Sequence, residues 1–271
     1  MIEYDPSYIF PQIVSSIMKL VVLGSGTSVP HARRAAAGFW LQTTTGSLLL
    51  DASADIAHRS AQERLDWPNL DSIWISHFHL DHLGGLAPFL FGVRWAPQTQ
   101  RRRKELRIFG PHGLRRILET FDAAGEYKLL DQPFPLQLFE VEPNQQFEIL
   151  PDIFARTFST PHTPESMAIR ISERDGNSIV YTSDTGLSEE LIDFCGAASV
   201  LLLECSFHRG KPVKTHLELS EAMEIARVSA PERLVLTHLY PEWDEVDIVA
   251  EAKKLWPGET IEAFDGLHLE F

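Results

Sequence analysis

The residues most suited to chemistry form one short cluster, His77-Phe-His79-Leu-Asp81-His82. The cluster follows the apolar run 72–76, which is predicted to be a strand, and residues two apart in an extended chain project to the same side. His77 and His79 can therefore chelate one ion. If the chain then turns into a helix, Asp81 and His82 are carried toward a second position. Imidazole and carboxylate ligands without a thiolate suit Zn²⁺, with Mn²⁺ or Fe²⁺ as alternatives.

Three further candidate ligands each come directly after a short apolar run. His162 follows Thr-Phe-Ser-Thr-Pro, Asp184 follows Ile-Val-Tyr-Thr-Ser, and His238 follows Leu-Val-Leu-Thr. In each case a strand would place one side chain at the same end of the sheets, where loops held by a rigid scaffold commonly carry functional residues. Taken singly, each could instead be a capping aspartate or a structural histidine. Together with the first cluster they predict a site for two metal ions.

The composition is that of a globular chain of 271 residues, with 44% apolar and 23% charged residues. Eleven histidines are an informative excess, because histidine is the commonest metal ligand. A formal charge of −14 opposes broad attraction to nucleic acid or an anionic membrane, but allows a local basic patch. The two cysteines, Cys195 and Cys205, are too few for a disulfide framework and favour a reducing compartment. We therefore expect a cytoplasmic protein.

The chain shows no sign of a membrane segment or a signal peptide. No apolar run approaches the roughly 18 residues of a spanning helix, so no membrane partner is expected. The first six residues lack a positive flank and a continuous apolar stretch. Met18, which opens the segment Met-Lys-Leu-Val-Val-Leu-Gly, is a more natural domain start. We expect 1–17 to be an N-terminal extension or ordered arm, and 18–271 to be one domain.

Short β-branched runs alternate with helical stretches along the whole chain. Strands are predicted over 19–23, 38–43, 47–51, 72–76, 106–109, 136–140, 153–159, 166–172, 178–183, 200–204, 233–237 and 267–270. Helices are predicted over 54–63, 85–93, 112–123, 188–194, 219–228 and 246–255. Because helices fall between groups of strands and not after every strand, this α+β pattern favours mixed sheets with helices outside over a doubly wound parallel sheet.

The order of these residues resembles the metallo-β-lactamase-fold hydrolases, and in particular their ribonuclease Z-like branch. The resemblance rests on the H-x-H-x-D-H cluster followed by His162, Asp184 and His238, with Asp51 ending an earlier strand. Further matching segments are LGSGTSVP, LLLD, RIFGPHG and LECSF, together with His216 before a predicted helix. The matching features are spread over residues 18–271.

The resemblance implies an αββα sandwich of two mixed sheets, with two metal ions at one edge between them. It also implies the ligand sets. One ion would be held by His77, His79 and His162, the other by Asp81, His82 and His238, and Asp184 would bridge both. Asp51 would orient a ligand histidine; its alternative role is that of a turn residue. A homodimer is also usual among such relatives.

Glu204 and His216 point to the reaction. Two divalent ions can activate water and neutralise charge in a phosphodiester transition state, and Asp81 can hydrogen-bond the attacking water as well as ligate. An alkoxide leaving group also profits from a proton donor, which a carboxylate-oriented histidine supplies. In the ribonuclease Z branch the residues matching Glu204 and His216 have this role. The structural alternatives are a strand-end acid and a neighbour of a helix cap.

One departure from ribonuclease Z bears on the substrate. The long arm that grips tRNA commonly lies between the positions of His162 and Asp184, which here are only 22 residues apart. We therefore expect a phosphodiesterase acting on a small or nucleotide-like diester. The alternatives are a tRNA 3′-processing endonuclease with atypical recognition, and a carboxylic ester, thioester or lactone hydrolase. The basic run Arg101, Arg102, Arg103 and Lys104 could contact RNA phosphates, or could be a solvated loop.

Overall fold

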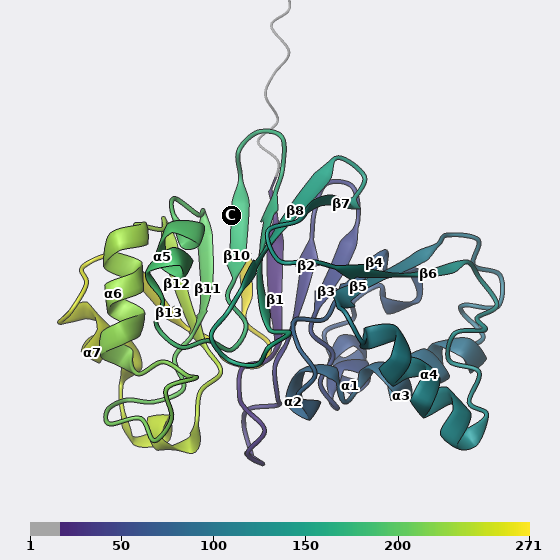
Figure 1. Cartoon of the computed structure of the whole chain (residues 1–271), viewed down its shortest axis with the longest axis horizontal. Coiled ribbons are helices and arrows are strands. Elements are labelled where there is room, and N and C mark those ends of the chain that lie inside the picture. The colour runs from purple at the N-terminus through teal and green to yellow at the C-terminus, as the bar shows by residue number, and fades with distance from the viewer. Residues whose placement is uncertain (1–16) are drawn as a thin grey trace, which may run out of the picture.

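Two β-sheets of seven strands each form the centre of the molecule, and helices cover their outer faces (Figure 1). The computed structural model describes residues 17–271. The expected extension over 1–17 therefore lies outside the described residues, apart from Ile17. The predicted arrangement of two mixed sheets with helices outside is confirmed.

The first sheet has the strand order β14-β1-β2-β3-β4-β5-β6. Pairing is antiparallel from β14 to β3 and parallel from β3 to β6. In chain order its strands are β1 (Lys19–Gly24), β2 (Gly38–Gln42), β3 (Ser47–Leu50), β4 (Ser72–Trp74), β5 (Leu106–Pro111), β6 (Leu136–Val141) and β14 (His268–Glu270).

The second sheet repeats this plan in the order β13-β12-β11-β10-β9-β8-β7. Pairing is parallel from β13 to β10 and antiparallel from β10 to β7. Its strands are β7 (Gln146–Leu150), β8 (Ile153–Ser159), β9 (Met167–Ser172), β10 (Ser178–Tyr181), β11 (Val200–Glu204), β12 (Arg233–Thr237) and β13 (Glu259–Glu262).

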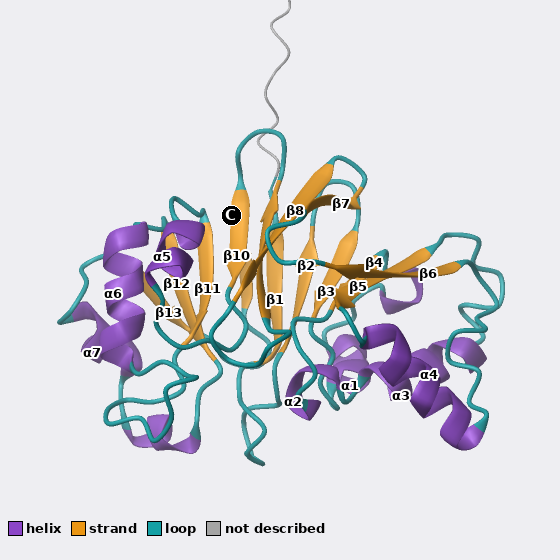
Figure 2. Ribbon diagram, in the orientation of Figure 1, coloured by secondary structure: helices purple, strands orange, loops and turns teal. Residues whose placement is uncertain are grey.

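The helices divide between the two outer faces, as the ribbon diagram shows (Figure 2). On the side of the first sheet are α1 (Ile56–Gln62), α2 (Leu80–Leu83), α3 (Leu86–Trp95) and α4 (Leu114–Gly125). On the side of the second sheet are α5 (Glu189–Cys195), α6 (Leu219–Ser229) and α7 (Ile248–Lys253). Two short 3₁₀ helices, η1 (Trp67–Asn69) and η2 (Pro241–Glu245), complete the set among the described residues.

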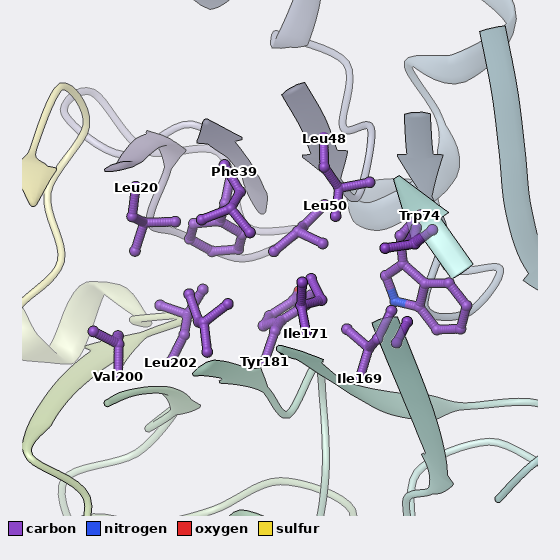
Figure 3. Close-up of a cluster of buried hydrophobic side chains, with 14 of the residues drawn as sticks. Leu20, Phe39, Leu48, Leu50, Trp74, Ile169, Ile171, Tyr181, Val200 and Leu202 are labelled. Carbon is purple, nitrogen blue, oxygen red and sulfur yellow. The ribbon is translucent and has the colours of Figure 1, made fainter. Parts of the chain in front are cut away.

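Alternation along the strands builds three apolar layers. In β11, Val200 and Leu202 face the first sheet, whereas Leu201 and Leu203 pack under the helices of the second. The inter-sheet layer is the cluster in Figure 3, where aromatic side chains such as Phe39 lie among the aliphatic ones. Successive strand residues point to opposite faces, and both faces of these central strands are covered, so the strands are apolar on both sides. Polar side chains that could form a site are therefore found where such a strand ends.

Two strands that the sequence did not predict are β7 and β13. They are the edge strands of the second sheet. Edge strands are partly exposed, and all four residues of β13 and three of the five in β7 are not buried. Neither segment therefore carries the continuous apolar run by which the inner strands could be recognised.

Candidate metal centre

Asp184 lies between two groups of histidine and aspartate side chains. Its Oδ2 faces the first group, 3.5 Å from Nε2 of His162 and 3.7 Å from Nε2 of His77. Its Oδ1 faces the second group, 3.2 Å from Nε2 of His82 and 3.3 Å from Nε2 of His238. One buried carboxylate therefore spans both groups.

The first group joins the end of β4 to a loop of the second sheet. His77 and His79 follow β4 two residues apart, and their rings are 4.7 Å apart. His162 follows β8, and its Nε2 lies 3.0 Å from Nδ1 of His79. One atom from each of these histidines and from Asp184 lie within 4.8 Å of one another.

The second group consists of Asp81, His82 and His238 together with Asp184. Asp81 and His82 lie on α2, which begins at Leu80, so the expected turn into a helix after His79 is present. Nε2 of His238 is 3.5 Å from Oδ2 of Asp81, and Nε2 of His82 is 3.8 Å from the same oxygen. All seven side chains that the sequence singled out as ligands are brought together.

Sharp turns at the strand ends direct these side chains. Asp51 after β3, Ser183 before Asp184, and His238 after β12 have φ angles of 57°, 55° and 57°. The left-handed region is uncommon for residues other than glycine, and such conformations cluster at functional sites. The site therefore lies at the ends of these strands, in the turns that follow them.

The chemistry of the donor set fits divalent ions. Among the described residues, Nε2 of His77, His82 and His238 and Oδ1 of Asp184 are buried without a hydrogen-bond partner. A buried polar atom left unpaired costs about 1–3 kcal/mol. Imidazole nitrogens and carboxylate oxygens that converge in this way are ligands for a metal such as zinc.

The electrostatics of the two groups favour a cation. Burial, with a smaller contribution from His82, lowers the pKa of His77 to about 2, so its imidazole stays neutral and keeps a lone pair. Burial favours the neutral acid of Asp184, but the positive fields of His238 and His82 outweigh it and hold its pKa well below the ordinary value. Burial also opposes protonation of His82, yet Asp184 and Asp51 raise its pKa. A divalent ion can take the place of that proton.

Asp51, which the family resemblance implied would orient a ligand, lies directly behind His82. Its Oδ2 is 2.7 Å from Nδ1 of His82, and its Oδ1 accepts the backbone N–H of Ser76 at 2.7 Å. The hydroxyl of Tyr181 also donates to Oδ2 at 2.7 Å. Sequence reasoning missed Ser76 and Tyr181, although both stand within three residues of a predicted ligand.

Glu204 and His216 form a pair beside both groups. Nδ1 of His216 is 3.0 Å from Oε1 of Glu204, and its ring lies 4.8 Å from that of His162 and 5.3 Å from that of His238. Burial opposes protonation of His216, but its hydrogen bond with Glu204 and the charge of that carboxylate raise its pKa.

Glu204, His216 and His238 also bring ligand atoms within 4.8 Å of one another. The Glu204 carboxylate, however, already accepts the N–H of Thr185 at 2.6 Å and that of Leu217 at 3.2 Å. It is therefore better placed to orient His216 than to bind an ion. Tyr240, which sequence reasoning also missed, lies close by, with its ring 6.4 Å from His216 and 6.3 Å from His238. Tyr240 stands two residues after His238, and this closeness to a predicted ligand is the sequence feature that could have identified it.

A cleft of about 960 Å³ adjoins Asp81. It is lined by the loop 27–36, by Asp55 and Arg59 near the start of α1, and by Leu80 and Asp81 of α2. Three of the ten loop residues are alanine, and the loop also carries His31, Arg33 and Arg34, so small apolar and basic side chains share the wall. The cleft has room for a molecule of nucleotide size.

Arg33 is the exposed cation of this loop. Its guanidinium lies 2.9 Å from Asp244, with 69% of the side chain exposed. The same carboxylate is already held by Arg34, which is buried, and by His31 at 2.8 Å. Because Asp244 has these two other partners, Arg33 can leave it for an anionic ligand at little cost.

The interval between His162 and Asp184 is short, as expected. It is occupied by β9, β10 and the turn between them. No long arm is therefore present between these two residues.

In the basic run 101–104, Arg101, Arg103 and Lys104 are exposed but one arginine is enclosed. Arg102 is buried, and its guanidinium donates to the carbonyl oxygens of Pro68 at 2.7 Å and Leu70 at 2.6 Å. The prediction that Arg102 faces RNA is therefore wrong. Lys104 pairs with Asp71 at 2.5 Å. The run precedes β5, whereas the site lies beyond the carboxyl ends of parallel strands, and a six-residue strand separates the two edges by roughly 20 Å.

The chain is similar to known metal-dependent hydrolases, in agreement with the geometry of the candidate site. Residues 47–239 match the family model described as "Beta-lactamase superfamily domain". The chain is 26% identical to ribonuclease Z of Thermoplasma acidophilum, over 95% of this chain and 97% of that protein. It is 27% identical to the probable metallo-hydrolase YhfI of Bacillus subtilis, over 90% and 96% of the two chains.

Solved structures show the same fold. The crystal structure of YhfI superposes with a TM-score of 0.77 at 25% identity, covering 94% of this chain and 100% of that one. A diphosphatase from the PhnP family gives a TM-score of 0.73 at 21% identity, covering 94% and 98%.

The chain belongs to the beta-lactamase superfamily, and it is a hydrolase of the metallo-β-lactamase fold. This fold implies the binding of divalent metal, which agrees with the convergent histidines and aspartates. Within residues 17–271, every helix is too short or too polar to cross a membrane.

Proposed function

We propose that the protein is a binuclear metal-dependent phosphodiesterase that acts on a small or nucleotide-like diester. The observation that carries this proposal is the Glu204–His216 pair, which adds a candidate proton donor beside the two ligand groups. A lactamase, lactonase or thioesterase has no need of such a pair.

In this proposal His77, His79 and His162 hold one ion, Asp81, His82 and His238 hold the other, and Asp184 bridges them. Zinc is the best match for imidazole and carboxylate ligands without thiolate, with manganese or iron as alternatives. When bound, two such ions neutralise charge on the phosphoryl oxygens and make water a stronger acid.

The residues of the chain then have separate tasks. Asp81 accepts a hydrogen bond from the attacking water and so orients it toward phosphorus. His216 donates the proton on its outer nitrogen to the departing alkoxide oxygen as the P–O bond breaks. Glu204 holds Nδ1 of His216 and stabilises its protonated form, in keeping with the raised pKa of that histidine.

The surroundings of the site support a small substrate. The cleft beside Asp81 can receive one organic arm of a diester along the alanine-rich loop 27–36. Arg33 at this loop can pair with a second phosphate of a nucleotide.

The second candidate is a tRNA 3′-processing endonuclease, and the similarity to ribonuclease Z favours it. The short interval between His162 and Asp184 and the buried Arg102 argue against this activity. If precursor tRNA is cleaved at all, we expect the reaction to weaken steeply as salt concentration rises.

Two further expectations belong to this proposal. The cytoplasm is the proposed location, because Cys195 and Cys205 are both buried and unpaired. A homodimer, implied by the family resemblance, is proposed as the working form and would be measured by light scattering.

A substrate panel tests the proposal. The purified, metal-loaded protein would be assayed on bis(4-nitrophenyl) phosphate, cyclic nucleotides, precursor tRNA, 4-nitrophenyl acetate and a β-lactam. We expect the diesters to be hydrolysed with higher kcat/KM than the acetate or the lactam. The reverse order would move the protein to the ester or lactam branch, and efficient, salt-insensitive tRNA cleavage would favour the endonuclease.

A further inference from the structure

Two buried serines each stand between a carboxylate and a histidine of the proposed metal centre. Ser76 follows β4 in the first sheet, and Ser206 follows β11 in the second. Both side chains are fully buried. Neither residue was singled out by its sequence, and neither is a metal ligand.

Ser76 connects Asp51 to His77. Its Oγ lies 2.8 Å from Oδ2 of Asp51 and 3.0 Å from Nδ1 of His77. The hydroxyl of Ser183 donates to the same Oγ at 2.7 Å. A serine hydroxyl offers one donor and two acceptor positions. Since Asp51 can only accept, Ser76 donates to it and accepts the Nδ1–H of His77, which leaves Nε2 with its lone pair facing Asp184.

The same carboxylate fixes a histidine of the other group directly. Nδ1 of His82 is 2.7 Å from Oδ2 of Asp51, and an ionised carboxylate again requires the proton on Nδ1. Asp51 therefore selects the Nδ1–H tautomer of both His82 and His77, the second through the hydroxyl of Ser76.

Ser206 repeats this arrangement around Glu204. Its Oγ donates to Oε2 of Glu204 at 2.6 Å and lies 3.0 Å from Nδ1 of His238. The other oxygen, Oε1, is 3.0 Å from Nδ1 of His216. Glu204 thus reaches the proposed proton donor directly and a proposed ligand through the serine.

We infer that Ser76 and Ser206 are positioning residues, through which Asp51 and Glu204 each set the tautomer of a second histidine and hold its Nε2 toward the ions. This inference rests on the proposed ligand sets. Its consequence is that Glu204 serves ion binding at His238 as well as proton donation by His216.

The first test measures ion affinity by competition with a chromophoric zinc chelator. Removal of a group that orients a ligand typically weakens metal binding by about 10–100-fold. We expect Ser76→Ala and Ser206→Ala each to weaken one of the two binding steps by this factor, and the double variant to weaken both. Ser76→Thr and Ser206→Thr keep a hydroxyl and should restore most of the affinity.

The matched control is Ser72→Ala. Ser72 is equally buried and lies in β4, but its hydroxyl donates to the carbonyl of Ile149 at 2.7 Å. We expect this variant to bind both ions as the wild type does. Equal affinity in Ser76→Ala, Ser206→Ala and the control would overturn the inference.

The second test reads the tautomers themselves in the metal-free protein by ¹⁵N NMR of the histidine rings. His77 and His238 should carry the proton on Nδ1, and each should lose this preference only in its own serine variant. Unchanged tautomers would also overturn the inference. Because neither readout uses a phosphodiester, the inference can fail while the proposed activity stands, and it can hold if the substrate proves to be a different one.

Discussion

At the scale of single residues, the candidate proton donor His216 lies beside the seven proposed ligands and is held by a different partner. His216 stacks nearly parallel to His238, at an angle of 14° between the rings, yet its Nδ1 is occupied by Glu204. Its outer nitrogen is therefore the atom available to substrate. A proton donor placed in this way matters most when the leaving group is a poor one.

The first prediction separates leaving-group catalysis from ion binding. His216→Ala should keep both ions, because His216 lies outside the seven proposed ligands. Its turnover of a cyclic nucleotide, which releases an alkoxide, should fall by about 10²–10⁴-fold. Turnover of bis(4-nitrophenyl) phosphate should fall much less, because a nitrophenolate departs without a proton. Steady-state kinetics on both substrates and metal analysis of the variant measure these effects.

Glu204→Gln adds a check on this first prediction. It should follow the same pattern more weakly in turnover, with a loss of ion affinity added through Ser206 and His238. Loss of an ion from His216→Ala would instead make His216 a ligand. Equal losses on both substrates would make it a general binding residue.

At the scale of elements, the sequence predicted the inner strands and the polar side chains that follow them, because local pattern and burial agree there. In β3, Leu48 and Leu50 face the inter-sheet core while Leu49 faces the helices, so the apolar run is continuous and Asp51 marks its end. The edge strands β7 and β13 lack such a run. Each of these two segments is a strand because it pairs with one neighbouring strand, and the pattern of its own residues does not indicate this.

Residues that act through tertiary contacts were out of reach of the sequence. Ser76, Ser206 and Tyr181 look like ordinary strand-end or core residues until two sheets bring them to Asp51 and Glu204. Arg102 is the reverse case, since a basic run indicates exposure and only the fold shows that this guanidinium is enclosed.

The second prediction concerns Arg102, whose four hydrogen bonds to backbone carbonyls tie η1 to the segment before β5. Arg102→Ala would leave these carbonyls without their donor, and we expect the free energy of unfolding to fall by about 3 kcal/mol. Urea unfolding followed by circular dichroism measures the loss. Arg101→Ala, at an exposed neighbour, should change stability by less than about 0.5 kcal/mol. Equal effects in the two variants would show that the buried hydrogen bonds contribute little.

The third prediction concerns the loop 27–36. If Arg33 leaves Asp244 to pair with a phosphate of the substrate, Arg33→Ala should raise KM for nucleotide diesters about 3–10-fold with little change in kcat. Bis(4-nitrophenyl) phosphate, which has no second phosphate, should be unaffected. Arg174→Ala is the matched control, because Arg174 lies in the turn between β9 and β10, is 74% exposed and pairs with Asp152. The same rise in KM for both variants would indicate a general charge effect.

At the scale of the whole molecule, the two sheets contribute unequal halves of one site. The segment His77–His82 belongs to the first sheet, whereas His162, Asp184 and His238 follow strands of the second. Ions bound between them would join the two sheets, and they would bind the folded chain far better than the unfolded one. Metal should therefore stabilise the entire fold and not just the loops around it.

The fourth prediction measures this coupling. A ligand present at 100 times its Kd stabilises the folded state by about 2.7 kcal/mol for each site, so zinc should raise the Tm and a strong chelator should lower it again. A shift of roughly 2–4 °C per kcal/mol is expected for a domain of this size. Asp184→Ala should abolish the response to zinc, because the one carboxylate that faces both groups is gone and both ions are lost together. Asp193→Ala, at an exposed position of α5, should respond as the wild type does. Scanning calorimetry with metal analysis at each step measures both effects. If the Asp184→Ala protein still binds two ions, Asp184 is not the bridging ligand. If zinc leaves the Tm of the wild type unchanged, the ions do not hold the two sheets together.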